Sequence, residues 1–450
     1  MLGNWPLARV LGVCDSLSPC ACATRHGCLI VSPVIKKLSV KNFKSLKDIS
    51  LDFAPITLLV GENNTGKSSA LQILLLLKQS LENRELPLDF NGRIVDLGGL
   101  GEVITDKDVW NNYLEINTVF EEYDFLLQVD AKYGTLRIRK FQIRSSRNQF
   151  SYSITKGRHG VSCEFNNWRI TSKLKDLIIW NSFLVEEQNL WDSYRELARL
   201  LSNFNRKIKD YLRHKVHYLG PLMEYPHRKY EIKQPPEDVG FRGEQMPAVL
   251  YFADKKGKDE LLSKIRETTE KIKLVNDIRF TELYHGTYSC EVLVSGNRWV
   301  NLLDVGFGIS QILPIIVQGF FMPKGSTLLL EQPEIHLHPR LQAELGTILA
   351  EIANQGKTVI VETHSEHIIL RLQRLVAQRI LRPEDVAIYF FSIKENGYTE
   401  VQRIGVDELG QLESWPEGFF ETDLKELDAY MDDIFERRKN EKSSNSGRGH

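Results

Sequence analysis

The segment GENNTGKSS, residues 61–69, constrains the fold more than any other part of the chain. It fits the pattern G-x-x-x-x-G-K-[ST], in which small residues let successive backbone N–H groups turn toward phosphate oxygens. The apolar run ITLLV before the loop predicts a buried strand, and KSSALQILLLLKQSL after it predicts a helix. This unit predicts a nucleotide-binding α/β fold, because a helix N-terminus favours phosphate. The alternative is a glycine-rich turn without a ligand.

The residue types of the loop suit distinct contacts with a nucleotide. Lys67 is expected to reach the β- and γ-phosphates, and the Ser68 hydroxyl is expected to bind Mg²⁺. Asn64 stands where glycine is common, and asparagine tolerates the left-handed backbone region better than most residues. The predicted nucleotide-binding residues of the loop are Gly61, Asn63, Asn64, Thr65, Gly66, Lys67, Ser68 and Ser69.

A second apolar strand, STLLLE, ends in Glu331, which predicts the acid that completes a Mg²⁺ site with Ser68. The next residue is Gln332, where such sites usually carry a second acid. Glutamine cannot take a proton from water at neutral pH, so hydrolysis is slow or the base has moved to Glu334. A third apolar strand, KTVIVE, leads to His364, which we expect near the γ-phosphate. The alternative is that this stretch only caps the next helix.

The segment DVGFGISQILP lies upstream of the acid strand and leads into a helix expected from about residue 309. Free N–H groups and a hydroxyl at a helix start favour an anion. We call this segment the signature, and its predicted nucleotide-contacting residues are Gly306, Gly308, Ser310 and Gln311.

Two sets of residues allow a metal site of another kind. The first is a transition-metal site in the loop after the acid strand, formed by Glu331, Glu334, His336 and His338. A loop that lines the nucleotide site is the favoured interpretation of these residues. The second is a zinc site near the N-terminus, although its spacing is not the paired C-x-x-C of common zinc modules, at Cys14, Cys20, Cys22 and Cys28.

Strands and helices alternate in the first and last thirds of the chain, which argues for a mostly parallel sheet covered on both faces. The middle carries strand-type alternation and then a helical pattern. The predicted parts are a disordered or mis-assigned extension at 1–33, an N-terminal ATPase half at 34–112, an antiparallel β lobe with a helical insertion at 113–298, a C-terminal ATPase half at 299–438, and a disordered tail at 439–450.

The composition excludes some classes of protein. A net charge of −1, with 42% hydrophobic and 26% charged residues, is typical of a soluble globular protein. It gives no overall field for nucleic acid or an anionic membrane, although a local basic patch stays possible. No apolar run reaches the roughly 18 residues of a membrane helix. Because no signal-peptide pattern is evident either, we expect a cytoplasmic protein without a membrane partner.

The order of phosphate loop, signature, acid strand and histidine resembles the ABC-type ATPase heads of the SMC and DNA-repair class. It resembles more closely the bacterial AAA-family ATPases akin to the overcoming-lysogenisation-defect (OLD) proteins. The resemblance covers about residues 34–425, and its most specific segments are LSVKNFKSLKDISLDFAPITLLVGENNTGKSS, EQPEIHLHP and ETHSEHII.

The resemblance implies that ATP and Mg²⁺ bind between two protomers. Gly308 and Ser310 of one protomer would then cap the γ-phosphate held by Lys67 of the other. The family pattern after the acid strand is Asp-Glu-Pro-Glu, whereas this chain has Glu331-Gln332-Pro333-Glu334. The resemblance therefore implies slow hydrolysis, with Glu334 as the most suitable base.

The resemblance also implies a partner. Some relatives of this kind serve anti-phage defence beside a separate effector protein, so the resemblance implies a separate effector as a partner here. OLD-type proteins often carry a Toprim nuclease, but fewer than 90 residues follow His364 and hold no obvious carboxylate set, so none is expected here. Two alternatives stay open. One is an ATP-dependent DNA-binding clamp that uses residues 113–300, and the other is a nucleotide-binding scaffold that does not hydrolyse ATP.

Overall fold

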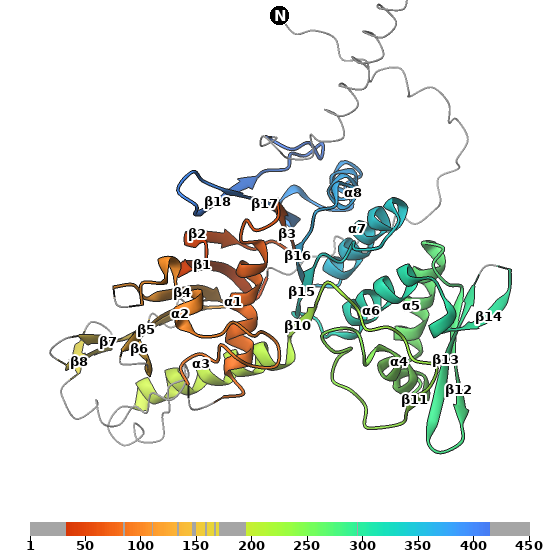
Figure 1. Cartoon of the computed structure of the whole chain (residues 1–450), viewed down its shortest axis with the longest axis horizontal. Helices are drawn as coiled ribbons and strands as arrows, with labels where there is room; N and C mark the ends of the chain where they lie inside the picture. Colours follow the sequence, from red (N-terminus) through yellow and green to blue (C-terminus); the bar gives the residue numbers. More distant parts are fainter. Residues whose placement is uncertain are drawn as a thin grey trace, which may run out of the picture.

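The computed structural model contains three β-sheets within the residues that it describes (Figure 1). Residues 1–32, which include the four early cysteines, and the predicted tail lie outside that part. So do residues 173–194 of the predicted helical insertion. The described residues are 33–83, 86–109, 111–132, 135–145, 150–157, 160–165, 168–170, 195–294 and 296–414.

The central sheet is built from the apolar runs that were predicted as buried strands. Its order is β10 (Val216–Leu219), β15 (Thr327–Glu331), β16 (Thr358–Glu362), β3 (Ile56–Gly61), β17 (Val386–Ile393) and β18 (Thr399–Ile404). All neighbouring strands are parallel except β17 and β18. The parallel strands of this sheet are covered on both faces, which explains their continuous apolar sequences. The predicted fold class, an α/β P-loop fold with a mostly parallel sheet, is confirmed.

Alternate residues of the central strands face two separate apolar clusters. One cluster lies on the face with α1 (Lys67–Ser80) and α3 (Arg195–His214) and includes Leu59, Leu329 and Ile360. The other lies on the face with α6 (Phe307–Phe321), α7 (Pro339–Asn354) and α8 (Glu366–Ala377) and includes Leu58, Leu330 and Val361. Because side chains alternate along a strand, the strand-end residues Glu331 and Glu362 continue the face that holds α1.

The second sheet is antiparallel and has the order β2 (Leu46–Asp52), β1 (Ile35–Phe43), β4 (Leu114–Phe120), β5 (Tyr123–Lys132), β6 (Thr135–Ser145), β7 (Phe150–Gly157), β8 (Gly160–Phe165) and β9 (Trp168–Ile170). Its inner face packs on α3 through edge-to-face rings such as Tyr123 and Phe204, whose centroids are 5.5 Å apart. The predicted β lobe is therefore continuous with β1 and β2, which precede the phosphate loop, and the sheet spans the predicted boundary at residue 112.

The third sheet packs on α5 (Asp259–Lys271), which in turn packs on α6 (Figure 1). It joins β11 (Tyr230–Glu231), β13 (Thr287–Val294), β12 (Asp277–Leu283) and β14 (Arg298–Asn301). The helices α4 (Met246–Lys255) and α5 lie beside it in Figure 1. Its Cys290 is buried and free. Within the described part of the chain, no helix is long and apolar enough to cross a membrane.

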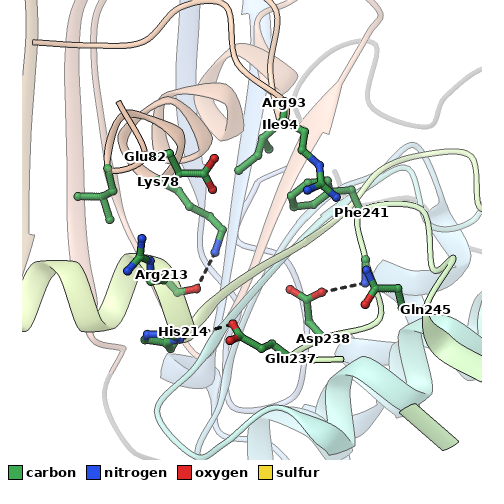
Figure 2. A pocket seen from close by; sticks show the side chains of 12 residues that line it. Lys78, Glu82, Arg93, Ile94, Arg213, His214, Glu237, Asp238, Phe241 and Gln245 are labelled. Carbon is green, nitrogen blue, oxygen red and sulfur yellow. Dashed lines mark hydrogen bonds and ion pairs between the residues drawn. The ribbon is translucent and has the colours of Figure 1, made fainter. Parts of the chain in front are cut away.

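A cavity of about 440 Å³ lies at the C-terminal end of α1 (Figure 2). The Lys78 ammonium donates to the carbonyl oxygens of Leu212, Arg213 and Val216 at 2.7–3.0 Å. It therefore caps two C-terminal carbonyls of α3, which have no partner within that helix, and also binds the first carbonyl of β10. The cavity is lined by both signs of charge, including Arg93, Glu237 and Asp238, and by none of the predicted nucleotide-binding residues.

Candidate nucleotide-binding site

The phosphate loop joins β3 to α1 with three residues at positive φ. Gly61 has φ 134°, and a Cβ there would collide with the carbonyl oxygen of Phe391. Gly66 has φ 96° and caps α1, where a side chain would meet Leu46 and Thr399. Asn64 has φ 62°, as its tolerance of the left-handed region predicts. The loop conformation therefore requires these residue types at these positions.

The side chains of the loop divide into inward and outward sets. Lys67 is 3% exposed, and its ammonium donates to the carbonyl oxygens of Gly61 at 3.0 Å and Glu62 at 2.5 Å. Thr65 is buried and donates to the Glu62 carbonyl at 2.8 Å. Asn63 and Asn64 are exposed. The loop thus presents its outer rim to solvent and holds one positive charge inside.

The Ser68 hydroxyl donates to Glu362 Oε1 at 2.8 Å. Glu362 is the last residue of β16, and it pairs in register with Glu331, the last residue of β15. Glu331 interacts with the Tyr218 hydroxyl and lies near the Lys44 ammonium. The structure therefore places two carboxylates beside the start of α1. Glu331 is the carboxylate predicted from the sequence, whereas Glu362 was not predicted as a site residue.

A third carboxylate, Glu334, lies in the loop after β15. It is 8% exposed, and its Oε1 accepts from the backbone N–H of His364 at 2.6 Å. Its charge is near enough to Lys67 to influence the lysine. Gln332 has φ 43° and donates its backbone N–H to the carbonyl oxygen of Glu362 at 2.8 Å. Gln332, Glu334 and His364 are therefore brought together with the phosphate loop, as the sequence predicted.

Burial shifts the pKa of the three carboxylates and of Lys67 at this edge of the sheet. Burial, followed by the charge of Glu362, raises the pKa of Glu331 to about 7. Burial also raises the pKa of Glu334 and of Glu362, against hydrogen bonds from the His364 N–H and the Ser68 hydroxyl. The pKa of Lys67 is lowered by burial, which the neighbouring acids oppose. Raised carboxyl pKa values suit proton acceptors that work near neutral pH.

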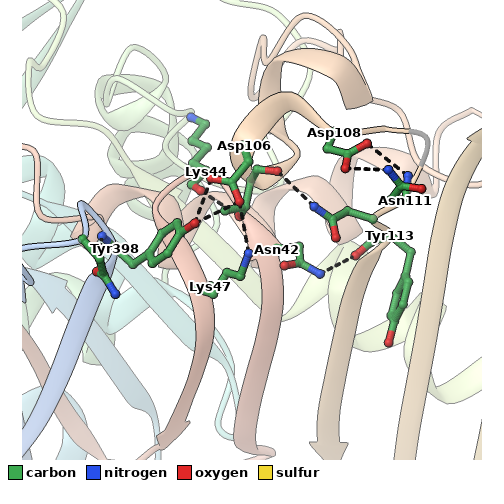
Figure 3. Close-up of polar contacts among 11 residues, drawn as sticks. Asn42, Lys44, Lys47, Asp106, Asp108, Asn111, Tyr113 and Tyr398 are labelled. Atoms are coloured by element: carbon green, nitrogen blue, oxygen red, sulfur yellow. Dashed lines mark hydrogen bonds and ion pairs between the residues drawn. The ribbon is translucent and has the colours of Figure 1, made fainter.

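Two turns from distant parts of the chain support the phosphate loop. Thr399 donates its hydroxyl to the Thr65 carbonyl at 2.8 Å, and its N–H bonds the Ser45 carbonyl at 2.9 Å. The Lys44 ammonium donates to Gln72 Oε1 at 2.7 Å. Figure 3 shows Tyr398 and Lys47 converging on Asp106, which has φ 61°. Thr399 thus holds the loop directly, and the other contacts hold the segments beside it; no local sequence pattern indicated them.

The signature differs in detail from the expectation. Helix α6 begins at Phe307, two residues early, so Gly308 and Ser310 lie within its first turn. Ser310 is 5% exposed, and its hydroxyl donates to the Phe307 carbonyl at 2.7 Å. Gln311 is buried and bonds the backbone of Pro221 and Met223. This conformation does not present the Ser310 hydroxyl to a second copy.

The exposed residues of the signature include Gly306 and Phe307. The Phe307 ring is 37% exposed and meets His336 edge-on, with ring centroids 5.0 Å apart. Arg228 binds Asp304 through two hydrogen bonds of 2.7 and 3.0 Å, which fixes the neighbouring segment 220–230 against the signature. The signature and the loop after β15 therefore form one continuous surface.

The transition-metal alternative receives no support. His338 caps α7 by accepting the N–H of Arg340 at 3.3 Å, and His336 packs on Phe307. Among the residues with described positions, no group of three or more His, Cys, Asp or Glu side chains is arranged to hold a metal ion. The alternative zinc site of the early cysteines lies outside the described residues.

A family model described as "AAA domain, putative AbiEii toxin, Type IV TA system" matches residues 56–370. The match spans the phosphate loop, the signature, the acid strand and His364. The chain belongs to this family. It is accordingly an ATPase of the AAA type. A second model, for a protein of unknown function (DUF3696), matches residues 381–429.

Individual relatives are more distant. The OLD nuclease of Thermus scotoductus is 21% identical over 371 residues, which cover 78% of this chain and 62% of the relative. The chain thus spans less than two thirds of that protein. With the family match, this relative confirms the predicted resemblance to OLD-like ATPases.

Two solved structures are similar to the chain at low scores. An SMC head bound to the C-winged helix domain of ScpA is 15% identical with a TM-score of 0.41, and covers 84% of this chain and 99% of its own. The SMC head domain from Thermotoga maritima is 12% identical with a TM-score of 0.37, and covers 83% and 99%. At these scores the likeness carries no functional inference.

Proposed function

We propose that this ATPase binds ATP and Mg²⁺ at the carboxyl edge of the central sheet, forms a homodimer on ATP, hydrolyses ATP slowly and controls a separate effector protein. The observation that carries the proposal is the convergence of Lys67, Ser68, Glu331 and Glu334 at that edge. In open parallel sheets, ligands bind beyond the carboxyl ends of the strands. The family match supports the nucleotide, whereas the dimer, the rate and the effector are proposals.

The residues at this edge fit a nucleotide with its metal ion. The loop amides and Lys67 would hold the phosphates, and Ser68 with Glu331 would hold Mg²⁺. Glu334 Oε2 and Glu362 Oε2 are buried and find no hydrogen-bond partner among the described residues. Buried carboxylate oxygens are costly unless a cation or a donor satisfies them. When bound, Mg²⁺ neutralises charge on the β- and γ-phosphates.

The side chains that would act on water are Glu334, Gln332 and His364. Glu334 keeps one oxygen free while the other holds the backbone of His364, so it is placed to accept a proton. Gln332 has no basic group and would only orient water. His364 would contact the γ-phosphate from its place beside Lys67. A single base that is partly engaged in holding the backbone is consistent with slow hydrolysis.

The surface around the signature supports association with a second copy. The side chains of Phe307, Leu222 and Tyr225 are 37%, 51% and 57% exposed. Their segments are joined by the bonds of Gln311 and by the Arg228–Asp304 pair. Exposed apolar side chains that cluster in one place mark interaction surfaces. We therefore place the ATP-dependent dimer contact at Gly306, Phe307 and the loop after β15.

Substitution Gly306→Arg tests this contact. Gly306 has φ −62°, and a Cβ there meets nothing within 4 Å, so the arginine fits the isolated chain. ATP binding measured by calorimetry should be unchanged, because Gly306 is outside its own chain's phosphate loop. Light scattering should show that the variant remains monomeric in ATP, whereas the wild-type mass doubles.

The matched control is Gln378→Arg, which adds the same charge at the exposed end of α8. It should dimerise like the wild type. If the wild type has the same mass with and without ATP, the dimer is excluded. If Gly306→Arg dimerises normally, the contact lies elsewhere.

A slow ATPase that dimerises on ATP would spend most of its time in the ATP-bound state. A long-lived ATP-bound state suits a switch that a partner protein recognises. We therefore favour control of an effector protein in the cytoplasm over a role that needs rapid ATP turnover. The DNA-clamp alternative gains no support from Lys41 of the antiparallel sheet, because this lysine already pairs with Asp48 and Glu115. The scaffold alternative differs from our proposal only in ATP turnover.

A further inference from the structure

Glu362 ends β16 as a carboxylate with no evident structural need for its charge. Its side chain is 2% exposed, and Oε1 accepts the Ser68 hydroxyl at 2.8 Å. Oε2 is buried and has no hydrogen-bond partner among the described residues. A glutamine would accept the same hydroxyl bond without the cost of burying a charge.

No side chain of the described chain neutralises Glu362 by direct contact. The charge of Lys67 acts on Glu362, but the Lys67 ammonium hydrogen-bonds the carbonyls of Gly61 and Glu62. The register partner of Glu362 is Glu331, a second acid. Side chains in register on adjacent parallel strands point to the same face, with the strands about 4.8 Å apart. Glu362 is buried and Glu331 is half-buried, and two acids side by side repel each other unless a cation lies between them.

We propose that Glu362 is a direct ligand of the divalent cation, which Ser68, Glu331 and Glu362 hold together. This inference rests on the proposed nucleotide site. Mg²⁺ is commonly bound through one or two carboxylates together with substrate phosphates, and both carboxylates here lie on rigid strand ends. The hydroxyl that a phosphate loop offers to the metal already contacts Glu362. Glu362 therefore lies with Ser68, where the metal ion would bind, whereas Glu334 lies with His364.

The site should therefore bind a cation more tightly than one with a single acid. Mn²⁺ suits the same oxygen ligands and is visible by electron paramagnetic resonance. Four forms of the full chain are saturated with ADP and titrated with Mn²⁺. They are the wild type, Glu362→Gln, Glu331→Gln and the double variant. Each single substitution should weaken Mn²⁺ by roughly ten-fold or more, since even groups behind a metal ligand contribute 10–100-fold.

Two further measurements separate a ligand from a structural residue. ADP binding in EDTA should be the same in wild type and Glu362→Gln, which shows that the loop is intact. The fold-loss of Mn²⁺ affinity in the double variant should be smaller than the product of the fold-losses in the two single variants, because both acids act on one ion. The control Glu395→Gln, in an exposed turn, should leave Mn²⁺ affinity unchanged.

Equal Mn²⁺ affinity in wild type and Glu362→Gln overturns the inference, whatever happens to hydrolysis. That result would leave the nucleotide site standing, since ADP would still be bound. If the wild type binds neither ADP nor ATP, the proposed function itself fails. The two failures are thus distinguished by nucleotide binding in EDTA.

Discussion

Replacing Lys67 by alanine is expected to weaken ATP binding by on the order of 100-fold, because a charged hydrogen-bond donor is worth about 1.5–3 kcal/mol. Lys67 is 3% exposed and lies inside the loop over the carbonyls of Gly61 and Glu62. The measurement is calorimetric titration of ATP with Mg²⁺ into wild type and variant.

The control for this prediction is Lys394→Ala. Lys394 is exposed and pairs with Glu400 in the β17–β18 hairpin, so the variant removes one positive charge away from the loop. Its ATP affinity should match that of the wild type. Comparable ATP affinity in Lys67→Ala would mean that the loop at 61–69 does not bind the phosphates.

Glu334→Gln is expected to lower single-turnover ATP hydrolysis by roughly 10²–10⁴-fold, the usual contribution of a positioned acid–base group. Glutamine keeps an oxygen that can accept the His364 N–H, so the loop should stay in place. ATP affinity should therefore change little, and the loss should appear in the chemical step. The measurement is the rate of ADP formation with protein in excess over ATP.

The isosteric variant Glu344→Gln provides the control, because Glu344 lies on α7 and pairs with Arg371 away from the phosphate loop. It should hydrolyse ATP at the wild-type rate. If Glu334→Gln also keeps the wild-type rate, Glu334 is not the base. Absence of hydrolysis in the wild type would favour the scaffold alternative.

Local patterns in the sequence were sufficient for the framework of the site. The loop at 61–69 can be recognised from its residue types at fixed spacing. The strands β15 and β16 can be recognised as apolar runs that end in polar residues. Parallel strands bring their carboxyl ends to one edge, so Glu331 and His364 could be placed near Lys67 without coordinates. Asn64 at positive φ follows from a property of asparagine alone.

Glu362 was within reach of the same reasoning. TLLLE and TVIVE have the same form, an apolar strand that ends in glutamate, and both strands lead to the same edge. Only the first was interpreted as a metal-binding acid, because on the second strand the role near the phosphates was assigned to His364. The hydrogen bond from Ser68 is the observation that links Glu362 to the metal site, and it could not be predicted from the sequence pattern.

Other features depend on contacts between distant segments. The pairing of β1 with β4 joins residues about 80 positions apart, and Thr399 reaches Ser45 and Thr65 across the chain. The burial of Ser310 follows from a helix start two residues earlier than expected, and helix boundaries are the least reliable part of a sequence interpretation. None of these follows from periodicity or spacing.

Single-turnover hydrolysis measured over a range of protein concentrations tests the central claim most directly. If ATP is bound by one chain and the site is completed by a second, the rate per bound ATP should rise with concentration and level off as the protein becomes dimeric by light scattering. A rate that is the same at all concentrations, while the protein stays monomeric, would contradict the shared site.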